Sequence, residues 1–181
     1  MKVLVTYATK YGATKGIAEF IAEKLHDRGL EVVAQEVRTV DNLGDYDAYV
    51  IGSALYMFHW LKEAKQFVSR NKEVLVSRPV WLFSSGPVGK ELKDPKGRDL
   101  KEVSGPKELD ELRDMVKARG HAVFFGALYA SRLTGLTGLG FRMATMSKSA
   151  RESMPEGDFR NWEEIGAWAA EIANSLQIVA K

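Results

Sequence analysis

Short runs of β-branched and aromatic residues alternate with amphipathic segments along almost the whole chain, and this alternation is the strongest constraint on the fold. It is typical of stacked βαβ units with a parallel sheet. Most runs are nearly continuously apolar, as strands buried on both faces should be. We therefore predict a three-layer α/β sandwich with a five-stranded parallel sheet and helices on both of its faces. The expected strands are Lys2–Thr6, Glu31–Val37, Tyr46–Gly52, Val80–Ser84 and Ala122–Leu128.

Apolar residues recur at helical spacing between these strands, and each set predicts one buried helix stripe. Gly29 and Gly120 follow the first and third of these segments, where a glycine can take the left-handed conformation that ends a helix. Asn161 and Glu164 resemble a capping box that starts the last helix. The residues expected to face inward are Ile17, Phe20, Ile21 and Leu25; Leu61, Ala64, Phe67 and Val68; Leu109, Leu112, Met115 and Val116; and Ile165, Trp168, Ala169, Ile172 and Leu176.

The composition limits the chemistry that the chain can perform by itself. The 181 residues suit a single domain, and the absence of cysteine excludes disulfides, iron–sulfur clusters and catalytic thiols. Redox chemistry would therefore need a bound cofactor, and we expect no metal site. A net charge of +2 is too small to imply nucleic-acid binding. We expect a cytoplasmic protein, because neither a signal peptide nor a membrane-spanning run is visible.

The segment after the first strand, Ala8-Thr9-Lys10-Tyr11-Gly12-Ala13-Thr14, runs directly into the first helix and is suited to bind a phosphate. Free backbone N–H groups, the positive end of the helix dipole and two hydroxyls would meet an anion there. Neither a Walker signature nor a three-glycine dinucleotide fingerprint is present, so a monophosphate ester fits better. The structural alternative is that Thr14 only caps the helix and Gly12 only makes a turn.

Ring-bearing side chains are concentrated after the third strand, in Ser53-Ala54-Leu55-Tyr56-Met57-Phe58-His59-Trp60. Tyr56 or Trp60 is predicted to stack on a planar ring, although Phe58 and Trp60 could instead start the next helix and pack inward. After the fourth strand, Ser84-Ser85-Gly86-Pro87 offers polar groups to the edge of such a ring. Ligands of open parallel sheets bind at the carboxyl ends of the strands, where the strand order reverses. The three loops therefore provide a phosphate site, a stacking platform and a polar rim, as one FMN would require.

These loops resemble the flavodoxin superfamily, and the resemblance covers nearly the whole chain. It implies a doubly wound sandwich whose five parallel strands have the order 2-1-3-4-5. Thr9-x-x-Gly12-x-Thr14 is similar to the flavodoxin phosphate loop, which implies FMN-phosphate contacts for residues 9–14. Tyr11 stands where the commonest form of the loop has another hydroxyl residue. Further motifs resemble the branch of menaquinone-dependent protoporphyrinogen IX dehydrogenases. They are Gly52-x-x-Leu55-x-x-x-His59-Trp60, Gly126-Ala127-Leu128-Tyr129, and Asn161-Trp162-Glu163-Glu164-Ile165 with Ala170-Glu171-Ile172.

Residues 131–153 form an insertion between the last strand and the last helix, where a short connection is usual. Its first part, Ser131–Arg151, mixes apolar and basic residues and contains no acidic residue. Such a segment can rest on an anionic membrane surface or receive a flat apolar molecule that carries carboxylates. The alternative is a subunit interface, as in a homodimer, or a lid on the fold. The residues predicted to make substrate or membrane contacts are Arg132, Phe141, Arg142 and Lys148.

The near-neutral charge of this chain differs from the strongly acidic electron-carrier flavodoxins, whose charge steers them to basic partners. We therefore hypothesise an FMN-dependent oxidoreductase that oxidises protoporphyrinogen IX and passes electrons to a quinone, as the resemblance implies. It would be free in the cytoplasm or peripheral on the inner face of the cytoplasmic membrane, and His59 would be its catalytic residue, assisting proton movement. The alternative is a flavodoxin-type protein that carries electrons between soluble redox partners.

Overall fold

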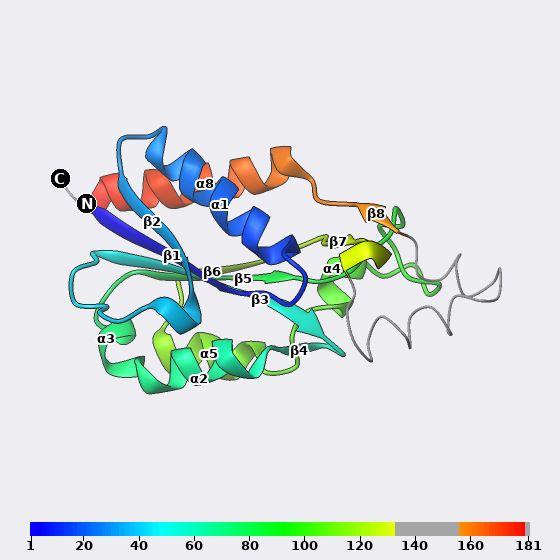
Figure 1. Ribbon diagram of the computed structural model, residues 1–181, viewed down its shortest axis with the longest axis horizontal. Helices are drawn as coiled ribbons and strands as arrows, with labels where there is room; N and C mark the ends of the chain where they lie inside the picture. Colours follow the sequence, from blue (N-terminus) through cyan, green and yellow to red (C-terminus); the bar gives the residue numbers. More distant parts are fainter. Residues whose placement is uncertain (133–155, 180–181) are drawn as a thin grey trace.

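The structure of the protein is a computed structural model that describes residues 1–132 and 156–179. Helices and strands alternate along most of the chain, as expected from the sequence (Figure 1). In chain order the elements are β1 (Lys2–Ala8), α1 (Ala13–His26), β2 (Glu31–Glu36), the 3₁₀ turn η1 (Val37–Thr39), β3 (Ala48–Tyr56), β4 (His59–Trp60), α2 (Lys62–Arg70), α3 (Lys72–Val76), β5 (Val80–Ser85), α4 (Leu100–Val103), α5 (Leu109–Val116), β6 (Gly120–Phe124), β7 (Ala127–Leu128), the 3₁₀ turn η2 (Ala130–Arg132), β8 (Gly157–Asp158) and α8 (Trp162–Val179).

The central sheet has the strand order β2-β1-β3-β5-β6, and neighbouring strands along this path run parallel. This order confirms the predicted 2-1-3-4-5 arrangement. Helices α1 and α8 cover one face of the sheet, and α2, α3 and α5 cover the other (Figure 1). The result is the three-layer α/β sandwich that the alternating sequence pattern predicts.

Each face of the sheet has its own hydrophobic core, because successive side chains of a strand point to opposite faces. In β1, Val3, Val5 and Tyr7 belong to the core under α1 and α8, whereas Leu4 and Ala8 belong to the core on the other face. Most of the predicted helix stripes are buried in these cores. The fully or almost fully buried members are Ile17, Ile21, Leu25, Ala64, Phe67, Val68, Leu112, Val116, Ile165, Ala169, Ile172 and Leu176.

The two predicted helix ends have different outcomes. Gly29 follows α1 with φ 82°, as expected. Helix α5, however, ends at Val116, and Lys117 takes the left-handed conformation with φ 50°. The prediction for Gly120 is therefore wrong, because this residue already belongs to β6. A Cβ atom on Gly120 would lie 3.1 Å from Cδ1 of Trp81. The lack of a side chain at Gly120 therefore makes room for the tryptophan ring and does not end a helix.

The predicted strand Ala122–Leu128 is two separate strands. β6 ends at Phe124, whose carbonyl accepts the N–H of Gly86 at 3.0 Å. The next N–H to pair is that of Gly126, which donates to the carbonyl of Pro87 at 2.9 Å. β7 then leaves the central sheet and pairs antiparallel with β8. This small sheet directs the chain across the edge at which the parallel strands of the central sheet end (Figure 1).

The last helix starts with the predicted cap. Oδ1 of Asn161 accepts the N–H of Glu164 at 3.1 Å, as in a capping box. The Glu164 carboxylate accepts hydrogen bonds from Nζ of Lys101, which lies in α4. This contact ties the start of α8 to the segment that follows β5.

Candidate functional site

The predicted loops meet at one edge of the sheet. Ala8 at the end of β1 is in register with Ser53 of β3, and Ser53 is in register with Ser84 of β5. The segments after β1, β3 and β5 therefore leave the sheet side by side, at the end of the molecule that carries α4, β7 and β8 (Figure 1). The strand order reverses between β1 and β3, since β2 lies on the far side of β1. Ligands of open parallel sheets bind at this position.

The first loop has the geometry of an anion site. Gly12 precedes α1 with φ 87°, a conformation that favours glycine, and its N–H donates to Oγ1 of Thr9 at 3.0 Å. No side chain among the described residues caps α1, and its first turn contains no acidic residue. The first N–H groups of a helix have no partner inside the helix, so those at Ala13 and Thr14 are oriented to bind an anion.

Thr14 adds an unused hydroxyl to this loop. Its side chain is completely buried, and Oγ1 has no hydrogen-bond partner among the described residues. Burying a hydroxyl without a partner costs free energy, so its retention at a helix N-terminus is best explained by a ligand. A phosphate ester oxygen would satisfy it. The residues of this loop therefore fit the phosphate of FMN.

The segment after β3 forms a β-hairpin that the sequence did not predict. β3 continues to Tyr56, and β4 pairs antiparallel with it, with Tyr56 opposite His59. The two residues between them, Met57 and Phe58, have φ values of 50° and 64°. Positive φ at both central residues is typical of a type I′ hairpin turn, which usually contains asparagine and glycine. Backbone strain at non-glycine residues is frequent in functional loops.

The tip of this hairpin is exposed and apolar. The exposed fraction is 40% for Tyr56, 83% for Met57 and 50% for Phe58. Nζ of Lys10, from the first loop, lies 4.3 Å from the ring centroid of Tyr56 and 5.6 Å from that of Tyr11. Partial burial, and then its proximity to Tyr11, raise the pKa of the Tyr56 hydroxyl. Tyr56 is thus a neutral aromatic platform next to the predicted phosphate loop.

Trp60 has a different environment from Tyr56. Its ring is only 2% exposed, and its indole N–H donates to Oγ of Ser84 at 2.8 Å. Because the hairpin reverses the chain, Trp60 lies opposite Leu55 and packs into the core under α2. The expectation that Trp60 stacks on a flavin is therefore corrected, and the inward-packing alternative holds for this residue. Of the two predicted stacking residues, Tyr56 is the accessible one.

The predicted polar rim is partly used by the protein itself. Oγ of Ser53 accepts the N–H of Leu61 at 3.0 Å and donates to the carbonyl of Ala54 at 2.9 Å. Ser84 contacts Trp60 and is completely buried, and Ser85 is 5% exposed. Ala54, Leu55, Gly86 and Pro87 are half-buried along the same edge. A ligand would meet these half-buried residues before it met the serine hydroxyls.

His121 is a site residue that the sequence reading missed. Its Nε2 lies 3.0 Å from Oγ of Ser84, which completes a chain from Trp60 through Ser84 to His121. Burial, and then the nearby positive charge of Arg113, lower the pKa of His121 to about 4. The imidazole is therefore neutral at pH 7. Only the pairing of β5 with β6 brings it to Ser84, so no local motif could have indicated it.

His59, the predicted catalytic residue, lies on the accessible side of the hairpin. Its Nδ1 is 2.8 Å from Oε2 of Glu108, and Oε1 of the same carboxylate accepts the N–H of Trp60 at 2.9 Å. Nζ of Lys65 is 3.3 Å from Oε1. Glu108 therefore fixes His59 and the hairpin to the start of α5.

Arg132 lies beside the phosphate loop. Its Nη1 is 3.6 Å from the position that a Cβ atom on Gly12 would occupy. The other predicted contacts of the insertion, Phe141, Arg142 and Lys148, lie outside the described residues. Among the described residues, no helix is long and apolar enough to cross a membrane.

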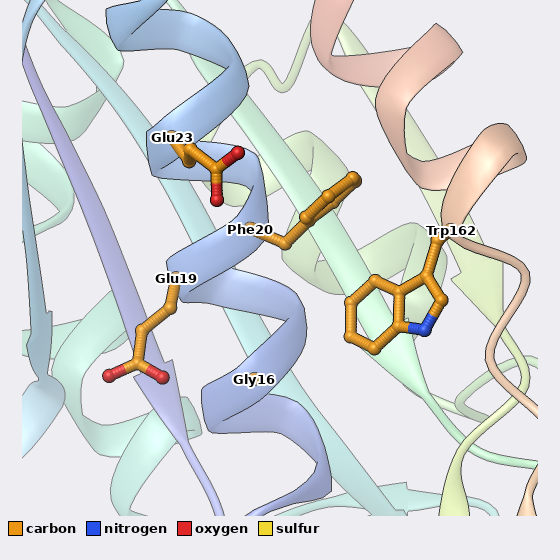
Figure 2. A pocket seen from close by; sticks show the side chains of 5 residues that line it. All are labelled: Gly16, Glu19, Phe20, Glu23 and Trp162. Carbon is orange, nitrogen blue, oxygen red and sulfur yellow. The ribbon is translucent and has the colours of Figure 1, made fainter.

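Two hollows lie near the start of α8. A groove of about 510 Å³ is lined by both charged and aromatic residues, but Lys101 is paired with Glu164 and Arg160 with Asp158. A second hollow, of about 440 Å³, lies between α1 and α8. Figure 2 shows Phe20 of α1 and Trp162 of α8 on its lining. Glu19 and Glu23 line this second hollow, and their charges disfavour an anion there. Neither hollow therefore matches a phosphate as well as the first loop does.

Comparison with known proteins agrees with this geometry. Residues 4–153 match the family model described as a flavodoxin domain, and the chain belongs to this family. It is a flavodoxin-like redox protein, and the family membership assigns it FMN as cofactor.

Curated and solved relatives support the same class. The chain is 24% identical over 182 residues to "Protoporphyrinogen IX dehydrogenase [quinone]" of Escherichia coli K12, with 96% of each chain covered. In fold it is similar to a flavodoxin from the domain Archaea, with a TM-score of 0.58, 17% identity, and 98% and 99% of the two chains covered. Oxidised Flavodoxin 2 from Bacillus cereus gives a TM-score of 0.58 at 20% identity, with the same coverage.

Proposed function

We propose that this protein is an FMN-dependent dehydrogenase that oxidises protoporphyrinogen IX and passes the electrons to a quinone. The observation that carries the proposal is the exposed apolar tip Tyr56-Met57-Phe58 beside Lys10, at the edge where the flavin would bind. A flat apolar substrate with carboxylates, and the flat ring of a quinone, both suit a surface of this kind.

The E. coli relative supports the choice of substrate. The name of this relative includes both protoporphyrinogen IX and a quinone, and the similarity extends over 96% of both chains. The net charge of +2 also differs from that of an acidic electron carrier. Both observations favour a small-molecule substrate over a basic redox protein as the partner.

Each loop has a distinct task in this proposal. Thr9, Gly12, Ala13 and Thr14 would hold the phosphate, and Tyr56 would face the ring system, with the half-buried rim of residues 54–55 and 86–87 at its edge. FMN supplies the electron and hydride transfer when it is bound.

His59 would assist proton movement in this mechanism. Nδ1 is held by Glu108, so the other ring nitrogen is directed away from that carboxylate and can exchange a proton with the substrate. The substrate loses electrons and protons, and the quinone takes up both to become a quinol.

The experiment uses the FMN-loaded protein, protoporphyrinogen IX and a menaquinone analogue under nitrogen. We expect porphyrin fluorescence to rise faster than in the blank without protein, and to depend on the quinone. His59→Gln should lower this rate, while Lys62→Gln, an exposed neighbour in α2, should leave it unchanged.

No fluorescence above the blank would overturn the proposal. If the loaded protein instead accepts electrons from a soluble reductase and passes them to a redox protein without oxidising the porphyrinogen, it is a flavodoxin-type electron carrier.

A further inference from the structure

An arginine that is distant in the sequence lies beside Gly12, the residue that precedes α1. Nη1 of Arg132 is 3.6 Å from the position of a Cβ atom on Gly12, so the missing side chain of Gly12 leaves the guanidinium close to the loop backbone. The guanidinium carbon is 4.8 Å from the ring centroid of Tyr129, and the N–H of Arg132 donates to the carbonyl of Tyr129 at 3.0 Å. The ring contact orients the side chain, and the backbone hydrogen bond fixes the turn that carries it.

The small β7–β8 sheet carries this arginine to its place. Ala127 pairs with Asp158 in this sheet, and the N–H of Ala130 donates to the carboxylate of Glu156 at 2.9 Å. The hydrogen bonds from Arg160, and to a lesser degree the charge of Arg132, lower the pKa of Asp158. The strand pairing at Ala127 and the hydrogen bond at Ala130 thus attach the chain before Arg132 to residues 156–158, which lead into α8.

The positive charges at this position are only partly balanced without a ligand, because Asp158, the carboxylate whose pKa Arg132 helps to lower, already pairs with Arg160. The N-terminus of a helix has a partial positive charge, so a cation beside it is repelled. The first turn of α1 contains no acidic residue, and within the described residues the Arg132 guanidinium forms no ion pair. Arg160, which donates to the carbonyl of Ala13 at 3.3 Å, is by contrast neutralised by Asp158. An anion between Arg132 and the helix would remove the repulsion.

The unused hydroxyl of Thr14 is an independent sign of a ligand at the same place. Thr14 is completely buried in the first turn of α1, and its Oγ1 has no partner among the described residues. A phosphate oxygen bound by the first N–H groups would be within reach of this hydroxyl.

We infer that Arg132 is a ligand of the FMN phosphate and sets the preference of the site for FMN over riboflavin. This inference rests on the proposed placement of the phosphate in residues 9–14. A phosphate monoester carries up to two negative charges near neutral pH, and a guanidinium can bind two of its oxygens at once. The partial positive charge of the helix N-terminus balances only part of the phosphate charge, and Arg132 would neutralise the rest.

The test compares flavin affinities of Arg132→Gln and wild type by titration of flavin fluorescence. We expect FMN binding to weaken about 10- to 100-fold and riboflavin binding to stay unchanged, because riboflavin lacks the phosphate. Arg132→Lys should recover part of the FMN affinity, since lysine keeps the charge but not the fork of donors. Added salt should weaken FMN binding more in wild type than in Arg132→Gln.

Arg119→Gln is the matched control. Arg119 is also exposed and lies over an aromatic ring, 5.6 Å from the centroid of Trp81, but it precedes β6 at the opposite end of the sheet. This variant should bind both flavins as wild type does. Thermal unfolding of the flavin-free variants separates a structural role from a ligand role, because Arg132→Gln should not lower stability if its partner is the phosphate.

Unchanged FMN affinity in Arg132→Gln, with normal binding by wild type, would overturn the inference and leave the proposed function intact. An equal loss of FMN and riboflavin affinity would also overturn it, since it would assign Arg132 to the fold or to the ring. If wild type itself binds neither flavin, the proposed phosphate site fails together with the inference.

Discussion

The carboxylate of Glu108 lies 2.8 Å from Nδ1 of His59, although 49 positions separate the two residues in the chain. The same carboxylate accepts the N–H of Trp60 and pairs with Lys65. Burial opposes ionisation of this carboxyl, but the hydrogen bonds from His59 and Trp60 outweigh it and lower the pKa of Glu108. An ionised Glu108 thus joins the hairpin to α5.

Glu108→Gln should destabilise the protein by about 1–2 kcal/mol at pH 7, because the variant loses the carboxylate charge that strengthens these hydrogen bonds. The folded pKa of Glu108 is lower than the unfolded one, so its contribution is complete above the unfolded pKa and is lost as pH falls through the folded pKa. Urea unfolding of wild type and variant should therefore differ at pH 7, and the difference should shrink as the pH falls through the folded pKa of Glu108.

Glu111→Gln, an exposed neighbour in α5, is the control and should change stability by less than about 0.5 kcal/mol. A Glu108→Gln effect of the same size at pH 7 and in acid would contradict the assigned role.

His121 should make the fold sensitive to mild acid. Its folded pKa is about 4, below the unfolded value of 6.5, so the unfolded state binds a proton more readily. Stability from this group is complete above pH 6.5 and falls as pH decreases toward 4, by about 2 kcal/mol at pH 5. Unfolding by urea at pH 7.5 and pH 5 measures this loss.

His121→Asn should lose less stability between these two pH values than wild type, whereas His26→Gln, at an exposed site in α1, should behave as wild type. An identical pH dependence in His121→Asn and wild type would be evidence against a buried neutral histidine.

The hairpin turn should be less stable than the sequence could make it. Met57 and Phe58 both have positive φ, which costs about 1–2 kcal/mol per non-glycine residue. The double variant Met57→Asn with Phe58→Gly should therefore raise the free energy of unfolding by about 1–2 kcal/mol. If the exposed tip contacts substrate, the same variant should oxidise protoporphyrinogen more slowly while FMN affinity is kept.

The change in stability and the change in activity are measured on the same preparation. A variant that is less stable than wild type would contradict the strained turn, and full activity would contradict a substrate contact of the tip.

The sequence predicted the parallel sheet because strands buried on both faces have nearly continuous apolar runs. It predicted the phosphate loop because Thr9, Gly12 and Thr14 follow the first of these runs. The sequence could not decide whether Tyr56 or Trp60 stacks on the flavin. Both rings have the same local context, and only the hairpin turn at Met57 and Phe58 decides which one is buried.

Contacts that depend on long-range pairing could not be predicted from the sequence pattern, although Arg132 itself was predicted as a substrate or membrane contact. His121 approaches Ser84 only through the register of β5 and β6, and Arg132 approaches Gly12 only through the β7–β8 sheet. Lys117, and not Gly120, ends α5 in the left-handed conformation. Gly120 is needed for another reason, because a side chain there would crowd the ring of Trp81.

Two buried threonines allow the most direct test of the central claim, that residues 9–14 hold the phosphate of FMN. Thr14 and Thr6 are both completely buried, and the hydroxyl of each has no hydrogen-bond partner among the described residues, but Thr6 lies within β1 and away from the loop. Valine replaces either threonine at nearly equal volume.

The measurement is the dissociation constant of FMN for wild type, Thr14→Val and Thr6→Val, with circular dichroism to verify the fold. We predict one FMN per chain for wild type, affinity about tenfold or more weaker for Thr14→Val, and unchanged affinity for Thr6→Val. Equal affinities in all three proteins, or a wild type that ignores added FMN, would contradict the claim.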